Sequence, residues 1–479
     1  MFRILRSHRP RECFSTAAKL HPYSNLPASA RQQKRRSWLI PGFGWVRRWG
    51  REAASTLLLA VPLLFILRSM KYAIVIPDGS ADEPVAELGG RTPLQAARTP
   101  NMDRVAQLGV VGLAENVPPS LTPASDVATL SLFGYDPLEV YTGRAPLEAA
   151  AMGLHLGPRD WAIRCNLVYV PDGHMRDFTA GHISTAEARE LIAALQAQLG
   201  GREIGGGVLE FHPGVQYRHI LLWRGKTDAS PLAQTRTQPP HDIPDRPVAE
   251  YLPVGPAREW LVELMEASRS ILATHPVNLR RQEAGHKPAT QIWLWGQGQA
   301  PRLTPFAERF GGVRGAIISA VDLVRGVGVL LGWHRIDVPG ATGYLDTNYA
   351  NKGKYAVEAL GAFDLVCVHI EAPDEASHEG RAEEKVRAIE QIDAHIVGPL
   401  LEALPRYGAY RLLVEPDHRT PLRTRAHAHG PVPFAACGTG IEPDDAGTYD
   451  EASAAAGSLR FQPGHTLMPW FLGLSQPRL

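Results

Sequence analysis

The chain has 479 residues, of which 44% are hydrophobic and 21% are charged, as in ordinary globular proteins. Its 50 basic residues balance 49 acidic ones, which excludes a charge-driven nucleic-acid binder and leaves basic residues to act locally. The length predicts two domains. The four scattered cysteines, without a C-x-x-C pair, exclude a disulfide framework and fit a cytoplasmic location.

The N-terminal segment, residues 1–69, differs from the rest of the chain. It is basic and aromatic, and it ends in an apolar run at 53–67 that is short for a membrane span of about 20 residues. The long basic region and the lack of a small-residue cleavage site argue against a signal peptide. A membrane anchor remains an alternative. We favour an extension outside the fold, with Met70 as the real start.

The first regular elements follow directly. Residues 72–77 form a continuous apolar run that predicts a buried parallel strand ending before Asp78. A helix is predicted over 99–109, because Thr99 can cap it and a proline follows. Ser125 lies at or just before the start of the next predicted helix.

Residues 153–302 have another character. Alternating apolar and polar residues predict a half-exposed antiparallel or mixed sheet. A helix over 184–200 begins with Ser184 and Glu187, which form a capping box. A second helix follows at 257–272. This block is interpreted as an inserted, smaller α+β domain.

After residue 303 the first pattern returns. Strand and helix alternate, which predicts a mostly parallel sheet covered by helices on both faces. The fold class is therefore α/β, with one domain made of residues 70–152 and 303–479. The predicted segments are strand–helix at 315–332, a helix at 348–363, a strand running into a polar loop at 364–380, one long helix at 381–404, and a strand at 410–416.

Metal-capable side chains follow three of these strands. In α/β proteins, ligands bind beyond the carboxyl ends of the strands. Mixed aspartate and histidine donors suit manganese, zinc or cobalt better than calcium. Three aspartates and three histidines are enough for two ions: Asp78, Asp374, His378, Asp417, His418 and His427.

Six motifs carry a resemblance to a known family: "IPDGSAD", "TPASDVATLSLFGYDP", "YTGRAPLEAAAMG", "SAVDLVRGVG", "VHIEAPDEASHEG" and "EPDHRTP…HAHGPVPF". Together they resemble the archaeal-type cofactor-independent phosphoglycerate mutases of the alkaline phosphatase superfamily, in the family order from Met70 onward. The resemblance implies an alkaline-phosphatase-like fold and an isomerase of glycolysis or gluconeogenesis. It would interconvert 2- and 3-phosphoglycerate through a phosphoserine, without 2,3-bisphosphoglycerate. A phosphotransferase of the same family acting on another acceptor, such as homoserine, is the alternative.

The resemblance also implies roles for individual residues. Ser125 would be the phosphorylated nucleophile, and the two divalent ions, manganese first with zinc, cobalt or magnesium as alternatives, would have separate ligand sets. The first set is Asp78, Ser125, Asp417 and His418, and the second is Asp374, His378 and His427. Relatives usually have an aspartate where Gly430 stands here. This departure affects the expected neighbours of His427, not the assignment of His427 itself. His429 is expected to be a loop residue beside the site.

The chemistry of a serine nucleophile agrees with this assignment. A hydroxyl needs activation, which a divalent ion supplies, and a helix N-terminus favours a phosphoryl group. Ser125 could instead be an ordinary helix cap, unless Asp126 takes that role. Ser120, Thr122 and Ser131 are alternative nucleophiles.

The substrate of a mutase has a carboxylate and a phosphate, which arginine binds in a planar fork. Lys352 resembles a family lysine near the transferring phosphate, and Arg164 is the expected catalytic arginine. The candidates for holding the small phosphorylated acid between the domains are Arg144, Arg164, Asn166, Asp177, Arg218, His241, Asp242 and Arg280, with Arg281 beside the last. A membrane-tethered phosphatase or binding protein is a third interpretation. No phosphate-cradling nucleotide motif is present.

Overall fold

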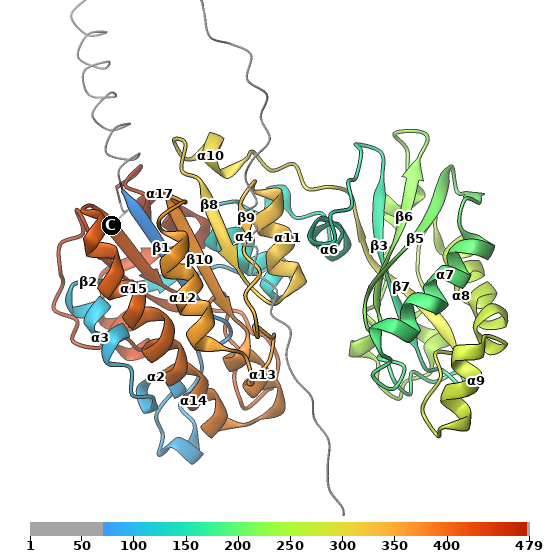
Figure 1. Cartoon of the computed structure of the whole chain (residues 1–479), viewed down its shortest axis with the longest axis horizontal. Helices are drawn as coiled ribbons and strands as arrows, with labels where there is room; N and C mark the ends of the chain where they lie inside the picture. Colours follow the sequence, from blue (N-terminus) through green and yellow to red (C-terminus); the bar gives the residue numbers. More distant parts are fainter. Residues whose placement is uncertain (1–69, 477–479) are drawn as a thin grey trace, which may run out of the picture. The chain divides into compact units, whose positions relative to one another are not determined.

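The computed structural model describes residues 70–476, which form two β-sheets of eight and five strands (Figure 1). The predicted N-terminal extension, with the apolar run at 53–67, lies outside the described residues. Among the described residues, no helix combines the length and apolar character needed to cross a membrane. The predicted domain boundaries at 152/153 and 302/303 remain predictions.

The larger sheet is mostly parallel, as predicted. β1 pairs in parallel with β10 on one side and with β11 on the other, and only β12 runs antiparallel to its neighbours. The strands in sheet order are β13 (Leu459–Phe461), β2 (Gly109–Ala114), β12 (Val432–Gly438), β11 (Tyr410–Val414), β1 (Lys71–Pro77), β10 (Leu365–Ile370), β8 (Gly315–Ile318) and β9 (His334–Arg335).

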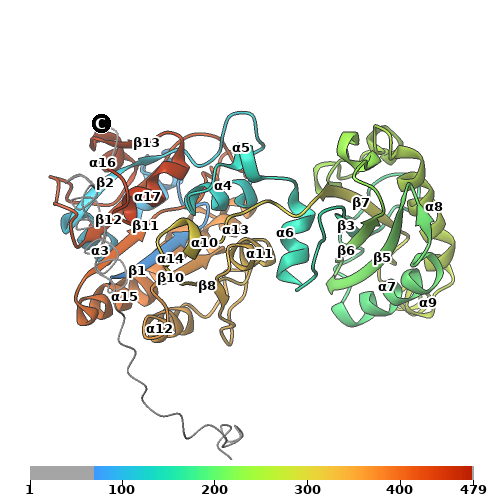
Figure 2. The ribbon, with the colours of Figure 1, turned by 90° about the horizontal axis from the view of Figure 1, so that it is seen from above.

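Side chains alternate between the two faces of this sheet, and helices cover both (Figures 1 and 2). Tyr72, Ile74 and Ile76 of β1 share one core with α4 (Ser125–Leu132), α6 (Arg144–Ala151), α10 (Phe306–Arg309), α11 (Asp322–Leu330) and α17 (Leu467–Phe471). Ala73 and Val75 share the opposite core with α2 (Pro93–Ala96), α3 (Pro100–Gln107), α12 (Tyr349–Ala359), α14 (Ala382–Ile392), α15 (Gly398–Ala403) and α16 (Glu451–Ala456).

The smaller sheet is antiparallel throughout. Its order is β4 (Glu203–Ile204), β5 (Gly207–Val215), β6 (Arg218–Gly225), β3 (Trp161–Val168) and β7 (Gln291–Gly298). One face packs on α7 (Thr185–Leu199), α8 (Arg258–Ala273) and α9 (Pro276–Glu283). The predicted capping box of Ser184 and Glu187 begins α7.

The expectation of a half-exposed sheet is wrong for β3, which is buried along its whole length. Its second face is covered as well, because Ala145 and Ala149 of α6 share a core with Ala162. The sequence of β3 alternates between apolar and polar residues although both faces are buried, because Arg164 and Asn166 point to this second face.

Two predicted segments after residue 364 differ in the structure. The polar loop after β10 is a helix, α13 (Ala372–Glu379), because Pro373 stands in its first turn and Gly380 ends it in a left-handed conformation. The predicted long helix at 381–404 is interrupted by a π-helical turn at Asp393–Val397. The Asp393 carboxylate accepts hydrogen bonds from the N–H groups of Asn101 and Met102, so it caps α3.

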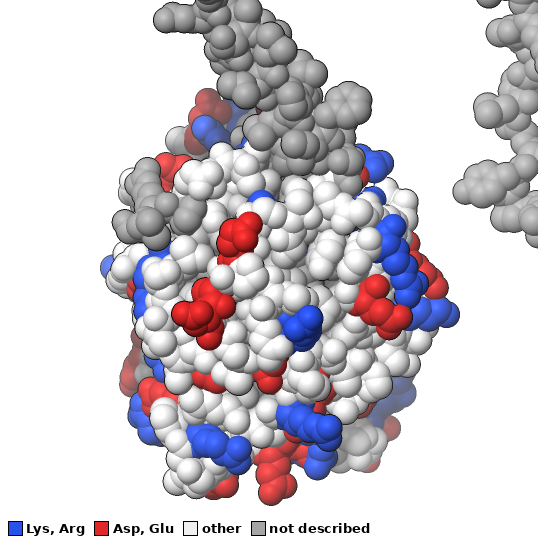
Figure 3. Space-filling view, turned by 90° about the vertical axis from the view of Figure 1, so that its left-hand side faces the viewer, with Lys and Arg blue, Asp and Glu red and all other residues white. Residues whose placement is uncertain are grey.

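On the face seen in Figure 3, charged residues of both signs are mixed, some lying singly among uncharged residues and others adjoining one another toward the edges. This distribution agrees with the balanced totals of basic and acidic residues in the sequence.

Candidate metal centre and active site

The metal-capable side chains follow three strands that are neighbours in the larger sheet, in the order β11, β1, β10. All three strands run parallel, so their carboxyl ends lie at one edge. Asp78 comes directly after β1, Asp417 and His418 come after β11, and α13 begins directly after β10. The structure thus brings the three predicted clusters together.

The first group of possible ligands consists of Asp78, Asp417 and His418. All three side chains are buried. The Nε2 of His418 lies 3.5 Å from Oδ1 of Asp78 and 3.4 Å from Oδ2 of Asp417. These two carboxylate oxygens are buried without a hydrogen-bond partner. Because buried acceptors are rarely left unpaired, a divalent cation between them fits this donor set.

Electrostatics at this edge also favour a cation. Burial and the neighbouring charges of Asp417, Glu371 and Asp374 raise the pKa of Asp78 well above its ordinary value. Burial likewise raises the pKa of Glu371 to about 7. Carboxylates gathered this closely disfavour their own ionised forms unless a positive charge lies among them.

The second predicted set consists of Asp374 and His378, one turn apart on α13, with His427 from the loop after β11. His418 also lies close enough to form one group with Asp374 and His427. Oδ2 of Asp374 lies 3.0 Å from Nε2 of His378 and 3.5 Å from Nε2 of His427, and the two nitrogens are 3.1 Å apart. Burial alone would raise the pKa of Asp374, but hydrogen bonds from His378 and His427 hold it well below its usual value.

The second nitrogen of each histidine shows which atom faces the site. Nδ1 of His378 lies 2.9 Å from the carbonyl of Arg425, and Nδ1 of His427 lies 3.3 Å from the carbonyl of Pro123. A carbonyl can only accept, so each Nδ1 carries a proton, and the Nε2 proton that donates to Asp374 is the one that a bound cation would replace. His429 is different, because its Nε2 lies 2.9 Å from the carbonyl of Leu121.

Ser125 lies at the first position of α4, and its hydroxyl is 3.2 Å from Nε2 of His418. Ser120 and Thr122 are exposed, and Ser131 lies buried further along the helix. The residue before the helix is Ala124, so neither Ser125 nor Asp126 is the cap. The hydroxyl of Ser125 therefore remains directed at the first ligand group.

A third group, Asp78, His369 and Glu371, was not anticipated from the sequence. Nε2 of His369 lies 2.8 Å from Oδ2 of Asp78, and its Nδ1 lies 3.2 Å from the hydroxyl of Ser319. The ring thus connects Asp78 to the end of β8. "VHIE" reads as ordinary buried strand in the sequence, so only the fold reveals this contact.

Lys385 on α14 is a second unanticipated residue. Its fully buried ammonium donates to Oδ2 of Asp82 at 2.7 Å and to the carbonyl of Thr420 at 3.0 Å. Lys385 therefore connects the segment after β1, which carries Asp78, to the segment after β11, which carries Asp417.

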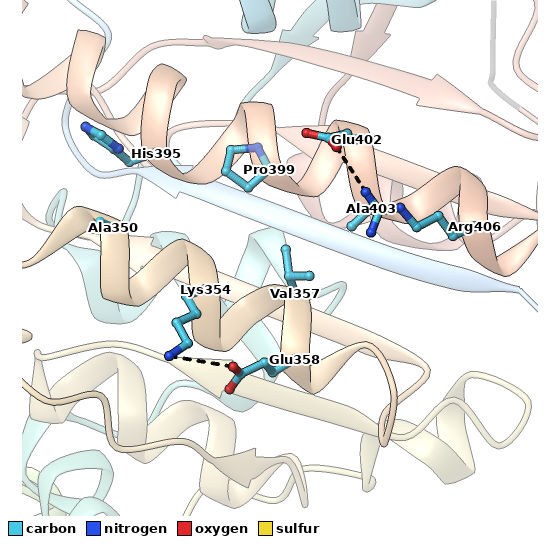
Figure 4. Close-up of a pocket in the computed structure, with 9 residues that line it drawn as sticks. All are labelled: Ala350, Lys354, Val357, Glu358, His395, Pro399, Glu402, Ala403 and Arg406. Atoms are coloured by element: carbon cyan, nitrogen blue, oxygen red, sulfur yellow. Dashed lines mark hydrogen bonds and ion pairs between the residues drawn. The ribbon is translucent and has the colours of Figure 1, made fainter.

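Replacing Lys385 with methionine should lower the free energy of unfolding by about 3–5 kcal/mol, since it leaves the Asp82 carboxylate buried without its cation. Urea denaturation of the metal-free protein measures this effect. Lys354→Met is the matched control, because Lys354 forms an exposed pair with Glu358 at 4.0 Å (Figure 4); a change within about 0.5 kcal/mol is expected there. Equal losses in both variants would contradict the role of Lys385.

The predicted arginines Arg144 and Arg164 share one carboxylate, that of Glu148. Oε1 of Glu148 lies 3.3 Å from Nε of Arg144, and Oε2 lies 2.8 Å from Nε of Arg164. The guanidinium of Arg164 also stacks 4.2 Å from the ring centroid of Trp295. Burial lowers the pKa of Arg164 to about 10, which still leaves it charged. One carboxylate against two guanidinium groups leaves an excess positive charge for an anion.

Three more candidates lie with this pair. Asn166 accepts a hydrogen bond from the Trp295 indole at 3.2 Å and faces Arg218 across the strand pair β3–β6. The rings of His241 and Trp295 pack edge to face, with their centroids 5.2 Å apart. Burial, and then the charges of Arg144 and Arg164, lower the pKa of His241 to about 4, so it is neutral.

The remaining substrate candidates have other partners. Asp177 pairs with Lys287 at 2.9 Å. Asp242 accepts from Gln238 at 3.0 Å. Arg280 is exposed on α9, 3.7 Å from Glu190. Arg281 is buried and donates to three backbone carbonyls and to Glu187.

Lys352 is buried on α12, where its ammonium donates to the carbonyl of His369 at 3.3 Å. Burial lowers its pKa to about 8. The side chain therefore lies beside the third group rather than among the ligands of the first two.

A surface hollow of about 430 Å³ lies between α12 and α15. Its lining includes the exposed pairs Lys354–Glu358 and Arg406–Glu402 (Figure 4). None of the predicted site residues lines it, and we assign it no part in the site.

The chain is similar to proteins of known family. It matches the family model for 2,3-bisphosphoglycerate-independent phosphoglycerate mutase over residues 106–278. It is 50% identical over 400 residues to a protein of that name from Methanothrix thermoacetophila, covering 83% of this chain and 98% of the relative. It is 51% identical over 410 residues to a probable enzyme of that name from Geobacter sulfurreducens, covering 84% and 100%.

Among solved structures, the cofactor-independent phosphoglycerate mutase of Thermoplasma acidophilum superimposes with a TM-score of 0.58 at 27% identity. The match covers 85% of this chain and all of that one.

Proposed function

Because this chain belongs to the family of 2,3-bisphosphoglycerate-independent phosphoglycerate mutases, and is thereby an isomerase of 2- and 3-phosphoglycerate, we propose that it works through a phosphoserine at Ser125. The observation that carries this proposal is the contact of the Ser125 hydroxyl with His418, 3.2 Å away, at the sheet edge where three strand ends gather carboxylates and imidazoles. Homoserine as the acceptor is not favoured by these relatives.

The donor sets fit two divalent ions. One would be held by Asp78, Asp417, His418 and Ser125, and the other by Asp374, His378 and His427. The unpaired oxygens of Asp78 and Asp417, and two histidine nitrogens only 3.1 Å apart, support cations at both places. Mixed nitrogen and oxygen donors favour manganese, with zinc, cobalt or magnesium as alternatives. When bound, such ions lower the pKa of a coordinated hydroxyl and neutralise phosphoryl oxygens.

The chain's own residues then account for the exchange. The Ser125 oxygen forms a bond to phosphorus as the bond from phosphorus to the glycerate oxygen breaks, and the serine proton passes to that oxygen. The glycerate, now with two free hydroxyls, turns so that its other hydroxyl takes the phosphoryl group back from Ser125. The positive end of α4 favours the phosphorylated state of its first residue.

We assign the arginine cluster to the glycerate. Arg144 and Arg164 are held by Glu148 with excess positive charge, and a planar guanidinium matches a carboxylate. Asn166 and His241 contact the side chain of Trp295, and Arg218 lies opposite Asn166 on the neighbouring strand β6. Arg280 is left out of this assignment, because its partner is Glu190 on the surface. A cytoplasmic role in glycolysis or gluconeogenesis belongs to the same proposal.

The proposal is tested by an enolase-coupled assay on the purified protein with each phosphoglycerate. Activity should require manganese or a related ion and should need no added 2,3-bisphosphoglycerate. Homoserine with ATP serves as the comparison. Turnover of homoserine without turnover of phosphoglycerate would overturn the proposal.

Replacing Arg164 with lysine should lower kcat/KM by about 10- to 100-fold, mainly through a higher KM. The charge stays but the planar fork is lost, and hydrogen bonds to charged groups contribute about 1.5–3 kcal/mol. Arg280→Lys is the matched control and should leave both constants unchanged. A larger effect at Arg280 than at Arg164 would move the substrate site to α9.

A further inference from the structure

Thr420 lies two residues after His418 and was not anticipated from the sequence. Its side chain is fully buried. Its hydroxyl oxygen lies 2.5 Å from Oδ1 of Asp374 and 3.2 Å from Nδ1 of His418. These two residues belong to different proposed ligand sets, so this hydroxyl contacts one member of each.

The proton of this hydroxyl can be assigned by counting donors. A hydroxyl has one proton to give and can also accept. Asp374 binds a cation as a carboxylate, which has no proton and can only accept. The Thr420 proton therefore lies in the short contact to Asp374, and the Thr420 oxygen is left to accept from Nδ1 of His418.

This assignment decides which nitrogen of His418 faces the first group. With its proton on Nδ1, the ring presents the Nε2 lone pair toward Asp78, Asp417 and Ser125. In His378 and His427 the Nδ1 proton is fixed by backbone carbonyls, which can only accept. His418 alone of the three depends on a group that could donate instead, and the contact with Asp374 prevents this.

The position of Thr420 is itself fixed. Its N–H donates to the carbonyl of Ala81 at 3.3 Å, and its carbonyl accepts from Lys385 at 3.0 Å. The hydroxyl is therefore held between the two groups by the backbone, not by the ligands that it contacts.

We propose that Thr420 is a positioning residue whose hydroxyl orients Asp374, fixes the tautomer of His418, and so links the two metal sites. The inference rests on the proposed two-ion centre and extends it to a residue outside both ligand sets. Such outer partners typically contribute 10- to 100-fold to metal affinity.

The test compares Thr420→Val, which removes the hydroxyl at nearly constant shape, with Thr420→Ser, which keeps it. Calorimetric titration of the metal-free proteins with manganese, and metal content after dialysis, are the readouts. The wild type and the serine variant should bind two ions with similar affinity. The valine variant should bind both ions about 10- to 100-fold more weakly.

Thermal unfolding of the metal-free proteins separates this effect from a packing defect, since valine should melt within a few degrees of the wild type. Should the valine variant not fold, Thr420→Ala takes its place in the same titration. A valine or alanine variant with both affinities unchanged, or a serine variant as weak as valine, would overturn the inference while the proposed function stands. A wild type that binds fewer than two ions would overturn both this inference and the two-ion centre of the proposed function.

Discussion

Replacement of Ser125 with alanine should reduce mutase activity by about 10⁴-fold or more, because the phosphoryl group loses its only covalent acceptor on the enzyme. The change removes one hydroxyl from a side chain that is 8% exposed, so the fold and the metal content should survive largely intact. The coupled assay measures the loss. Mass spectrometry of the unmodified protein incubated with phosphoglycerate should find phosphate on Ser125.

Ser131→Ala is the matched control for this experiment. Ser131 lies on the same helix, is buried, and should be replaceable with little loss of activity. Phosphate on any other residue, or near-normal activity of the Ser125 variant, would show that the nucleophile is assigned wrongly.

The histidines of the loop after β11 should differ sharply from one another. His418→Ala and His427→Ala each remove a ligand from a different ion, so each variant should lose metal and about 10³-fold or more in activity, as loss of a preorganised charge-stabilising group does. His429→Ala should cost little, because its Nε2 contacts only the carbonyl of Leu121. Emission spectroscopy on the three purified variants measures the bound metal.

The contrast between His427 and His429 is the informative comparison. Both follow the same irregular segment, two residues apart, and only His427 reaches Asp374. A His429 variant that loses an ion, with a His427 variant that keeps both, would reverse the assignment made here.

The sequence was sufficient for features that depend on local pattern. Apolar runs marked β1, β10 and β11, and the polar residues after each strand marked the edge where the ligands meet. Ser184 and Glu187 marked the start of α7. The family resemblance then assigned the ligands to two sets, and that division stays a prediction, because His418 lies close enough to group with Asp374 and His427 as well as with Asp78 and Asp417.

Other features depend on partners distant in sequence. Thr420 reads as a turn residue before a proline, and its meaning comes from Asp374, 46 residues earlier. Lys385 reads as one charge on an amphipathic helix, yet its partner Asp82 is 303 residues away. The helix α13 was missed because proline, acidic residues and a histidine resemble a loop unless the capping glycine is weighed.

The pairing of β1 has a consequence for the order in which the chain folds. Tyr72 pairs with Leu365 on one side and with Arg411 on the other. The whole smaller sheet lies in the sequence between Tyr72 and these two partners. At about 5–20 residues per second, the ribosome delivers the β11 side of this pairing roughly 20–70 s after β1. The metal edge therefore cannot assemble until β11 and the loop that carries His427 have been synthesised. In the nascent chain, the apolar strand β1 waits without its neighbours β10 and β11. The smaller sheet, whose strands follow one another in sequence, can form during that time.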